Sequence, residues 1–268
     1  MPHSDVPVDP PPQTLAREDG TVLAYYKTKA GKARTAEQPP LPGLMFLGGF
    51  KSDMGGDKAL ALEAYAQRSA RDFLRFDYRG HGASSGRFEE GTVGLWAEDA
   101  IAALDALTEG PQILVGSSMG GWIMLLVALA RPERVAGLVG IAAAPDFTED
   151  LIWATATPEQ RQLLKDQGYV DHPSDYSEAP YRITYRLIEE GRRHLLLRKA
   201  IPITCPVRLI HGKADADVPW QTSLRLAGAL ESDNVEVTLV KAAAHRLSEP
   251  EDLARLERIL ESLTARTR

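Results

Sequence analysis

The stretch Ile113-Leu114-Val115-Gly116-Ser117-Ser118-Met119-Gly120 joins a short apolar run to a turn made of small residues. The run predicts a buried strand, and the residues that follow, Met119–Ala130, are apolar nearly all round and predict a buried helix. Gly116 and Gly120 lack a Cβ, so the strand and the helix can approach closely around Ser118. This Gly-x-Ser-x-Gly context favours Ser118 as a nucleophile on a strained turn, with Ser117 as the less well-placed alternative.

On both sides of this turn, short apolar runs alternate with helical patterns. Within the helical patterns, apolar residues recur every three or four positions, as they do between Val93 and Leu107. This alternation predicts an α/β fold with a twisted, mostly parallel sheet flanked by helices. The predicted strands are Thr21–Tyr26, Leu44–Leu47, Phe73–Phe76, Ile113–Val115, Val139–Ile141, Val207–Ile210 and Val235–Val240.

Composition excludes several classes of protein. The 268 residues suit one large α/β domain, and 44% of them are hydrophobic, which is enough for a sizeable core. The net charge of −6 argues against nucleic acid as a partner. Cys205 is the single cysteine, so neither an intrachain disulfide nor a cysteine-based zinc site is available. The longest apolar runs are too short to span a bilayer.

The sequence predicts three regions. Residues 1–12 are rich in proline and predict a disordered tail. Residues 13–146 and 201–268 carry the strand–helix alternation of the core. Residues 147–200 hold no convincing strand, and two helical patterns, Pro158–Gln167 and Tyr181–Leu197, predict a helical cap over the sheet. Two ordinary surface helices are the alternative.

A serine nucleophile needs a general base, and the base needs a carboxylate that orients it. Asp215 follows the Val207–Ile210 strand in a His-Gly-x-x-Asp-x-x-Val-Pro pattern, and we expect it to be the acid. Asp217 is the rival acid. His245, in a loop after the last predicted strand, is expected to be the base, whereas His211 is expected to brace its loop.

Acyl transfer also needs backbone N–H donors for the carbonyl oxygen, which becomes negatively charged. Met119 directly follows the nucleophile, and we expect its N–H to be one donor. The loop after the Leu44–Leu47 strand begins Gly48-Gly49-Phe50, and we expect the N–H of Phe50 to be the other. We expect a structural role for His81, in Asp77-Tyr78-Arg79-Gly80-His81-Gly82.

These motifs together resemble the α/β-hydrolase superfamily, and the resemblance covers nearly the whole chain. A narrower resemblance, to its branch of mitochondrial palmitoyl-protein thioesterases and acyl-glucuronide esterases, rests on further segments. They are Ser52-Asp53-Met54, Lys58-Ala59-Leu60, Arg75-Phe76-Asp77-Tyr78, Gly110–Ser118, Gly120-Gly121-Trp122, Ala130-Arg131-Pro132-Glu133 and Val218-Pro219-Trp220. The resemblance implies a Ser118, Asp215 and His245 triad that cleaves thioesters and acyl esters.

We therefore expect a serine esterase or thioesterase that forms an acyl-enzyme on a small-molecule or acylated substrate, without metal or cofactor. Trp153, Tyr181 and Tyr185 of the cap are candidate substrate-binding residues. A short-chain carboxylesterase and a noncatalytic ligand-binding receptor of the same fold are the alternatives. The N-terminus carries Asp5 and Asp9, which mitochondrial presequences avoid, so we expect a cytoplasmic location.

Overall fold

The central strands are buried on both faces, as their continuous apolar runs predict. The computed structural model describes residues 10–30, 41–172 and 180–265. Successive side chains of a strand point to opposite faces of the sheet. In β3 (Gly43–Leu47), Met45 and Leu47 therefore pack into one core, and Leu44 and Phe46 pack into the other.

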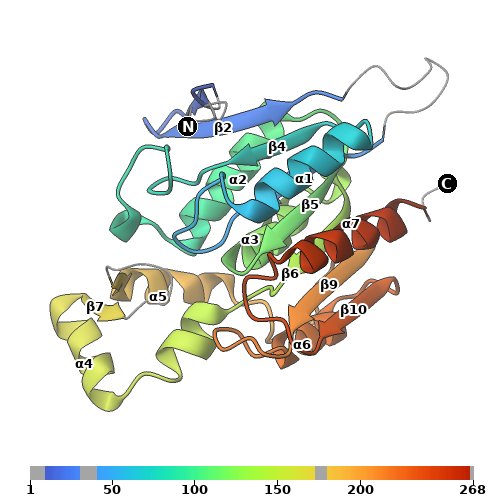
Figure 1. Ribbon diagram of the computed structural model, residues 1–268. Coiled ribbons are helices and arrows are strands. Elements are labelled where there is room, and N and C mark those ends of the chain that lie inside the picture. The colour runs from blue at the N-terminus through green and yellow to red at the C-terminus, as the bar shows by residue number, and fades with distance from the viewer. Residues whose placement is uncertain (1–9, 31–40, 173–179, 266–268) are drawn as a thin grey trace, which may run out of the picture.

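Within the described residues, eight strands form one sheet in the order β1-β2-β4-β3-β5-β6-β9-β10 (Figure 1). β2 pairs in antiparallel fashion with β1 and β4, and the other neighbours are parallel. The carboxyl ends of the parallel strands thus share one edge, where ligands bind in open α/β sheets. The remaining strands are β1 (Gln13–Ala16), β2 (Val22–Thr28), β4 (Phe73–Phe76), β5 (Gln112–Ser117), β6 (Val135–Ile141), β9 (Val207–Gly212) and β10 (Val235–Val240).

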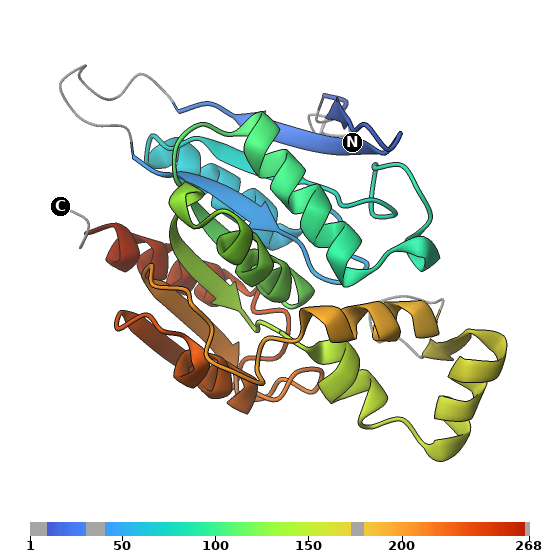
Figure 2. The same cartoon turned by 180° about the vertical axis from the view of Figure 1, so that it is seen from behind.

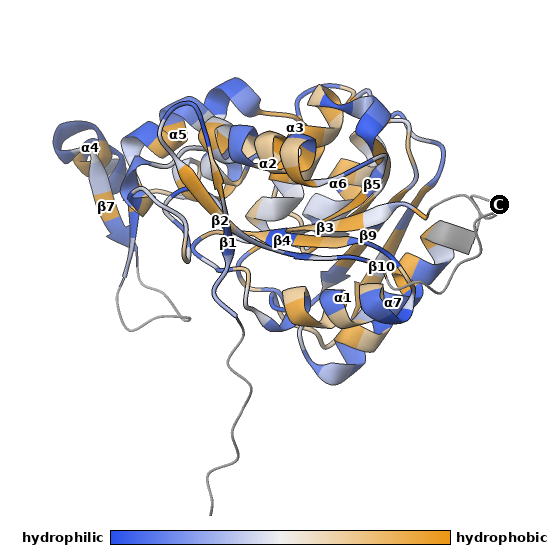
Figure 3. Ribbon diagram, turned by 90° about the horizontal axis from the view of Figure 1, so that it is seen from above, coloured by the Kyte–Doolittle hydropathy of each residue, from blue (hydrophilic) through white to orange (hydrophobic). Residues whose placement is uncertain are grey.

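Helices cover both faces of the sheet (Figure 3). α1 (Asp57–Arg68) and α7 (Pro250–Ala265) lie on one face, where Leu62 and Leu256 join one core. The other face carries α2 (Val93–Leu107), α3 (Met119–Ala130) and α6 (Gln221–Ala229). Two 3₁₀ turns, η1 (Phe88–Glu90) and η2 (Pro132–Arg134), complete this part of the chain. The arrangement confirms the predicted doubly covered sheet.

Between β6 and β9 the chain leaves the sheet for residues 142–206, which we call the insertion, and much of it projects to one side of the sheet (Figures 1 and 2). It contains the π-helix η3 (Thr148–Trp153), α4 (Pro158–Gln167), β7 (Tyr169–His172), β8 (Tyr181–Thr184), α5 (Tyr185–Gly191) and η4 (Arg192–His194). α4 has the predicted bounds, because Thr157 and Gln160 cap its start reciprocally and Gly168 ends it at φ +83°.

The expectation that 147–200 holds no strand is wrong. β7 and β8 pair in antiparallel fashion, with Tyr169 opposite Thr184. The predicted helix Tyr181–Leu197 is also wrong at its start, because Ile183 is buried while Arg182 faces outward and pairs with Asp171 at 3.0 Å. This alternation suits a strand, and α5 begins only at Tyr185.

A buried carboxylate anchors the insertion to the sheet. Asp146 follows β6 with φ +62°, and its carboxylate accepts the N–H groups of Leu196 at 2.8 Å and Leu197 at 2.9 Å. Arg198 pairs with the same carboxylate at 3.3 Å. Burial raises the pKa of Asp146, and its effect is larger than that of these three contacts, which lower the pKa. The two ends of the insertion are thereby tied together at the carboxyl edge.

The sequence also predicts a disordered N-terminal tail and no membrane-spanning segment. Residues 1–9 of the predicted tail lie outside the described residues, and at Pro10 the carbonyl oxygen accepts the Tyr26 hydroxyl at 2.7 Å. Among the residues described, we find no helix with the length and apolar character needed to cross a bilayer.

Candidate active site

Ser118 lies on the turn between β5 and α3, and its backbone is strained. Its φ of 54° and ψ of −117° fall where side-chain-bearing residues are rare. The Ser118 N–H donates to the Ile141 carbonyl at 2.9 Å, and its carbonyl accepts the N–H of Gly121 at 2.9 Å and of Ala144 at 3.0 Å. The end of β6 therefore holds the turn in place, as a nucleophile elbow requires.

The glycines around Ser118 are required by close backbone contacts. A Cβ on Gly116 would lie 2.4 Å from the Gly120 carbonyl oxygen, and one on Gly120 would lie 2.0 Å from that of Leu47. A Cβ on Gly121 would lie 2.4 Å from that of Ala143. These contacts confirm that α3 approaches β5 and the loop after β3 too closely for any side chain.

The structure brings Ser118, His245 and Asp215 together, although they come from three separate loops of the carboxyl edge. Ser118 Oγ lies 3.0 Å from His245 Nε2, and His245 Nδ1 lies 2.7 Å from Asp215 Oδ2. A carboxylate only accepts, so Nδ1 carries the proton and Nε2 is left to accept the serine hydroxyl. The Asp215 side chain is fully buried, whereas that of His245 is 16% exposed. The arrangement has the geometry of a nucleophile, base and orienting acid.

Four donors hold the Asp215 carboxylate. Its Oδ2 accepts His211 Nε2 at 3.1 Å as well as His245 Nδ1, and its Oδ1 accepts the N–H groups of Asp217 at 2.9 Å and Val218 at 2.8 Å. Burial acts to raise the pKa of Asp215, but the hydrogen bonds from His211 and His245 outweigh it and hold the pKa well below its usual range. Asp215 is therefore charged at neutral pH.

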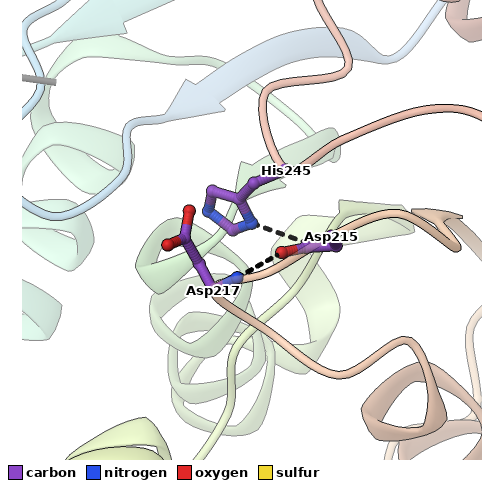
Figure 4. Close-up of side chains that lie close together, drawn as sticks. All are labelled: Asp215, Asp217 and His245. Carbon is purple, nitrogen blue, oxygen red and sulfur yellow. Dashed lines mark hydrogen bonds and ion pairs between the residues drawn. The ribbon is translucent and has the colours of Figure 1, made fainter. Parts of the chain in front are cut away.

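The rival acid, Asp217, occupies a different position. Figure 4 shows its carboxylate beside the His245 ring, while the dashed line from Nδ1 runs to Asp215. Asp217 is an exposed residue, and its carboxylate is not the hydrogen-bond partner of His245 Nδ1. Asp215, Asp217 and His245 also offer potential metal-ligand atoms within 4.8 Å of one another. Hydrogen bonds already engage Asp215 and His245, which accounts for their proximity without a metal.

The loop after β3 lies against Ser118. A Cβ on Gly49 would be 3.5 Å from that of Ser118, so the next peptide, that of Phe50, is close to the nucleophile. Within the described chain, neither the Phe50 N–H nor the Met119 N–H donates a hydrogen bond. Met119 is the first residue of α3, where backbone N–H groups have no partner inside the helix. Both predicted oxyanion donors are thus unengaged near Ser118.

His81 braces this loop, which is the structural role expected for it. Its Nε2 accepts the Lys51 N–H at 3.1 Å, and its Nδ1 donates to the Arg79 carbonyl at 3.2 Å. Burial lowers the pKa of His81 to about 4, so Nε2 is free to accept at neutral pH. The sequence did not indicate this contact, because it joins loops that lie 30 residues apart.

The three aromatic candidates of the insertion differ in their ring contacts. The Tyr181 ring lies 6.2 Å from the Phe50 ring, next to the loop after β3. Trp153 and Tyr185 pack together at 5.8 Å, and both, like Tyr181 and Phe50, pack against the small buried cluster of Leu164, Ile183 and Ile188. Of the three, only Tyr181 has a described ring contact with a residue of the site.

Comparison with known proteins places this geometry in context. Residues 41–256 match the model of the alpha/beta hydrolase family. Over 250 residues, the chain is 42% identical to human palmitoyl-protein thioesterase ABHD10, mitochondrial, covering 93% of this chain and 78% of that protein. The chain belongs to the alpha/beta hydrolase family.

Solved structures agree with this family assignment. Alpha/beta hydrolase domain-containing protein 10 from mouse superposes with a TM-score of 0.86 at 40% identity, covering 96% of this chain and 99% of that one. A protein from Agrobacterium vitis S4 gives 0.87 at 38% identity, covering 95% and 100%. The predicted α/β-hydrolase fold and the expected kinship to an esterase and thioesterase branch are confirmed.

One expectation is overturned by these comparisons. The human and mouse palmitoyl-protein thioesterase relatives are named as mitochondrial proteins. The predicted cytoplasmic location is therefore wrong. The prediction gave weight to Asp5 and Asp9, and both lie outside the described residues.

Proposed function

We propose that this chain is a serine hydrolase that cleaves acyl thioesters and esters through an acyl-enzyme. The observation that carries the proposal is the continuous hydrogen-bonded line from Ser118 Oγ through His245 to the buried Asp215 carboxylate. The thioesterase names of relatives about 42% identical support thioesters as the substrate class.

In the proposed reaction, each step uses one of these groups. His245 Nε2 takes the proton as Ser118 Oγ bonds to the acyl carbon, and the Asp215 carboxylate stabilises the resulting imidazolium. The N–H groups of Phe50 and Met119 receive the negative carbonyl oxygen. Collapse of this intermediate breaks the bond to the leaving thiol, which takes the proton from His245. Water then attacks the acyl-serine with His245 as the base, releasing the acid and restoring Ser118.

We also propose that residues 147–200 act as a cap above the carboxyl edge, with 13–146 and 201–268 as the core. Phe50 supports this division, because its ring contacts two residues of the cap, Tyr181 at 6.2 Å and Phe147, the first residue of the cap, at 5.7 Å. The cap would then form one wall of the acyl or leaving-group pocket. Trp153 and Tyr185 fit the interior of the cap, and Tyr181 fits its substrate side.

The test is hydrolysis of matched acyl thioesters and oxygen esters, from two to sixteen carbons, by the wild type and Ser118→Ala. Ser117→Ala is the matched control, because it removes a hydroxyl one residue away. We expect activity in the wild type and in Ser117→Ala, and loss of about 10³-fold or more in Ser118→Ala. An intact-mass increase of one acyl group on the wild type and on Ser117→Ala, but not on Ser118→Ala, supports the acyl-enzyme.

The same assay separates the alternatives. A preference for long thioesters supports a thioesterase resembling the named relatives, and a preference for short oxygen esters supports a carboxylesterase. Tight ligand binding without turnover by the wild type contradicts the proposal and favours a noncatalytic receptor. Full activity in Ser118→Ala also contradicts it.

A further inference from the structure

Lys51 places a positive charge beside the candidate site, and among the described residues this charge has no acidic partner. Its ammonium lies 5.1 Å from the centre of the Tyr181 ring and 5.6 Å from that of Phe88. None of the ion pairs among residues 10–30, 41–172 and 180–265 includes Lys51. The residue is exposed, so the charge remains accessible to a ligand.

The backbone fixes where this charge lies. Lys51 directly follows Phe50, and its N–H donates to buried His81 at 3.1 Å. Its φ of 57° turns the chain sharply after Phe50. The two rings that hold the ammonium come from opposite sides, Phe88 from η1 of the core and Tyr181 from β8 of the insertion. The charge therefore lies where the insertion meets the core, one residue from a proposed oxyanion donor.

Neighbouring cations differ from Lys51 in having acidic partners. Arg87 lies 4.0 Å from both Glu89 and Glu90, and Arg182 pairs with Asp171 at 3.0 Å. Contacts with aromatic faces stabilise an ammonium but leave its charge uncompensated. Because Lys51 has no acidic partner within the described part of the chain, an anion on the substrate is the natural partner for its ammonium.

We propose that Lys51 selects substrates that carry an anionic group a few atoms from the scissile carbonyl. The inference rests on the proposed function, since it assigns a substrate class to that same site. Because Lys51 directly follows Phe50, a proposed oxyanion donor, the anion that it would bind is a carboxylate or phosphate attached to the substrate near the reacting carbon. The anion belongs to the leaving group or to the acyl group, and the chemistry recognised is the same.

The experiment compares two matched pairs of thioesters, using thiol release as the readout. For the leaving group, the probes are butanoyl thioesters of 3-mercaptopropanoate and of its neutral amide, 3-mercaptopropanamide. For the acyl group, they are succinyl and succinamoyl thioesters of 2-mercaptoethanol. The proteins are the wild type, Lys51→Met, Lys51→Arg and Lys165→Met. Lys165 is the matched control, because it is an exposed lysine over an aromatic ring, that of Trp153 at 5.8 Å.

For each pair, the selectivity ratio is kcat/KM for the anionic probe divided by kcat/KM for the neutral probe. We expect Lys51→Met to lower this ratio by about 5- to 20-fold in one of the two pairs. The affected pair identifies the side of the substrate that bears the anion. Lys51→Arg should retain most of the ratio, Lys165→Met should retain all of it, and 0.5 M salt should lower the wild-type ratio.

An unchanged ratio in Lys51→Met, with the wild type active on all probes, overturns the inference and leaves the proposed function intact. An equal fall in Lys165→Met also overturns it, because bulk charge would then be the cause. If the wild type hydrolyses none of the four probes and no member of the acyl series above, the result counts against the proposed function instead.

Discussion

Lowering the pH from 7 to 5 should weaken the wild type through His81. The side chain is 3% exposed, and burial lowers its pKa from 6.5 to about 4. The unfolded chain therefore binds a proton at His81 between pH 6.5 and 4 that the folded chain does not bind. The contribution of His81 to the free energy of unfolding is therefore fully present above pH 6.5 and is lost as the pH falls from 6.5 to 4.

The size of the effect follows from the two pKa values. Between pH 7 and pH 5, the folded state loses about 2 kcal/mol relative to the unfolded state through this one histidine. The physical cause is clear in the contacts, because protonated Nε2 can no longer accept the Lys51 N–H. The ring also lies among Tyr78, Phe88 and Trp96, with centroids 5.1 to 5.5 Å away, where a charge is poorly solvated.

Urea unfolding, followed by tryptophan fluorescence at pH 7 and pH 5, measures this contribution. His81→Gln keeps an acceptor at the side-chain end but cannot titrate, and should cost about 1–3 kcal/mol at pH 7. Its disadvantage should shrink by about 2 kcal/mol at pH 5. His172→Gln on the exposed strand β7 should follow the wild type at both pH values. Parallel pH dependences in wild type and His81→Gln would refute the reasoning.

Three further predictions test the site and its supports. Gly121→Ala should destabilise the fold by about 1–3 kcal/mol or more, because the new Cβ would lie 2.4 Å from the Cβ of Ala143. Its control, Gly228→Ala, has open space around it in α6 and should stabilise the fold by up to about 1 kcal/mol; urea unfolding measures both variants. Asp215→Asn should lower kcat about 10³- to 10⁴-fold, and Asp217→Asn should lower it less than about 10-fold; the reverse order in the thioester assay would make Asp217 the acid. Glu190→Gln should lower the Tm by several degrees, because Glu190 accepts the Gly94 N–H at 3.1 Å and pairs with His194, joining α5 to the start of α2.

The sequence indicated the central strands well because burial on both faces leaves a continuous apolar run. Phe73–Phe76 was predicted with the bounds that the structure has. Val235–Val240 was also predicted with the right bounds, although β10 is an edge strand with exposed residues. β1 (Gln13–Ala16) lacks this signal, because it is an edge strand with three exposed residues. Its position is fixed by pairing with β2, and this contact leaves no mark in local hydropathy.

The hairpin of β7 and β8 was missed for a related reason. Its strands are four residues each, and only Ile183 among their side chains is buried. Tyr181–Thr184 also runs directly into α5, so the apolar positions of the two elements merge into one apparent helical pattern. Pairing across the hairpin decides the structure here, and pairing partners are not visible in a single local window.

At the candidate site, chain order indicated the three residues proposed for the triad, but it does not explain why His245 and not His211 is the proposed base. Both rings reach the same oxygen, Asp215 Oδ2, at 2.7 and 3.1 Å. Their other nitrogens distinguish them. His211 Nδ1 lies 2.7 Å from Ser223 Oγ in a fully buried side chain, and its Nε2 also donates to the Val218 carbonyl at 3.0 Å.

With both nitrogens engaged and no access to substrate, His211 can hold the carboxylate but cannot exchange a proton with a reacting group. His245 uses only Nδ1 on Asp215 and directs Nε2 to Ser118 Oγ at 3.0 Å from a partly exposed ring. A base must have one nitrogen bound by the acid and the other available to the nucleophile and the leaving group. His245 meets both conditions. His211 instead contributes to the low pKa of Asp215, which keeps the carboxylate charged and able to stabilise the His245 imidazolium.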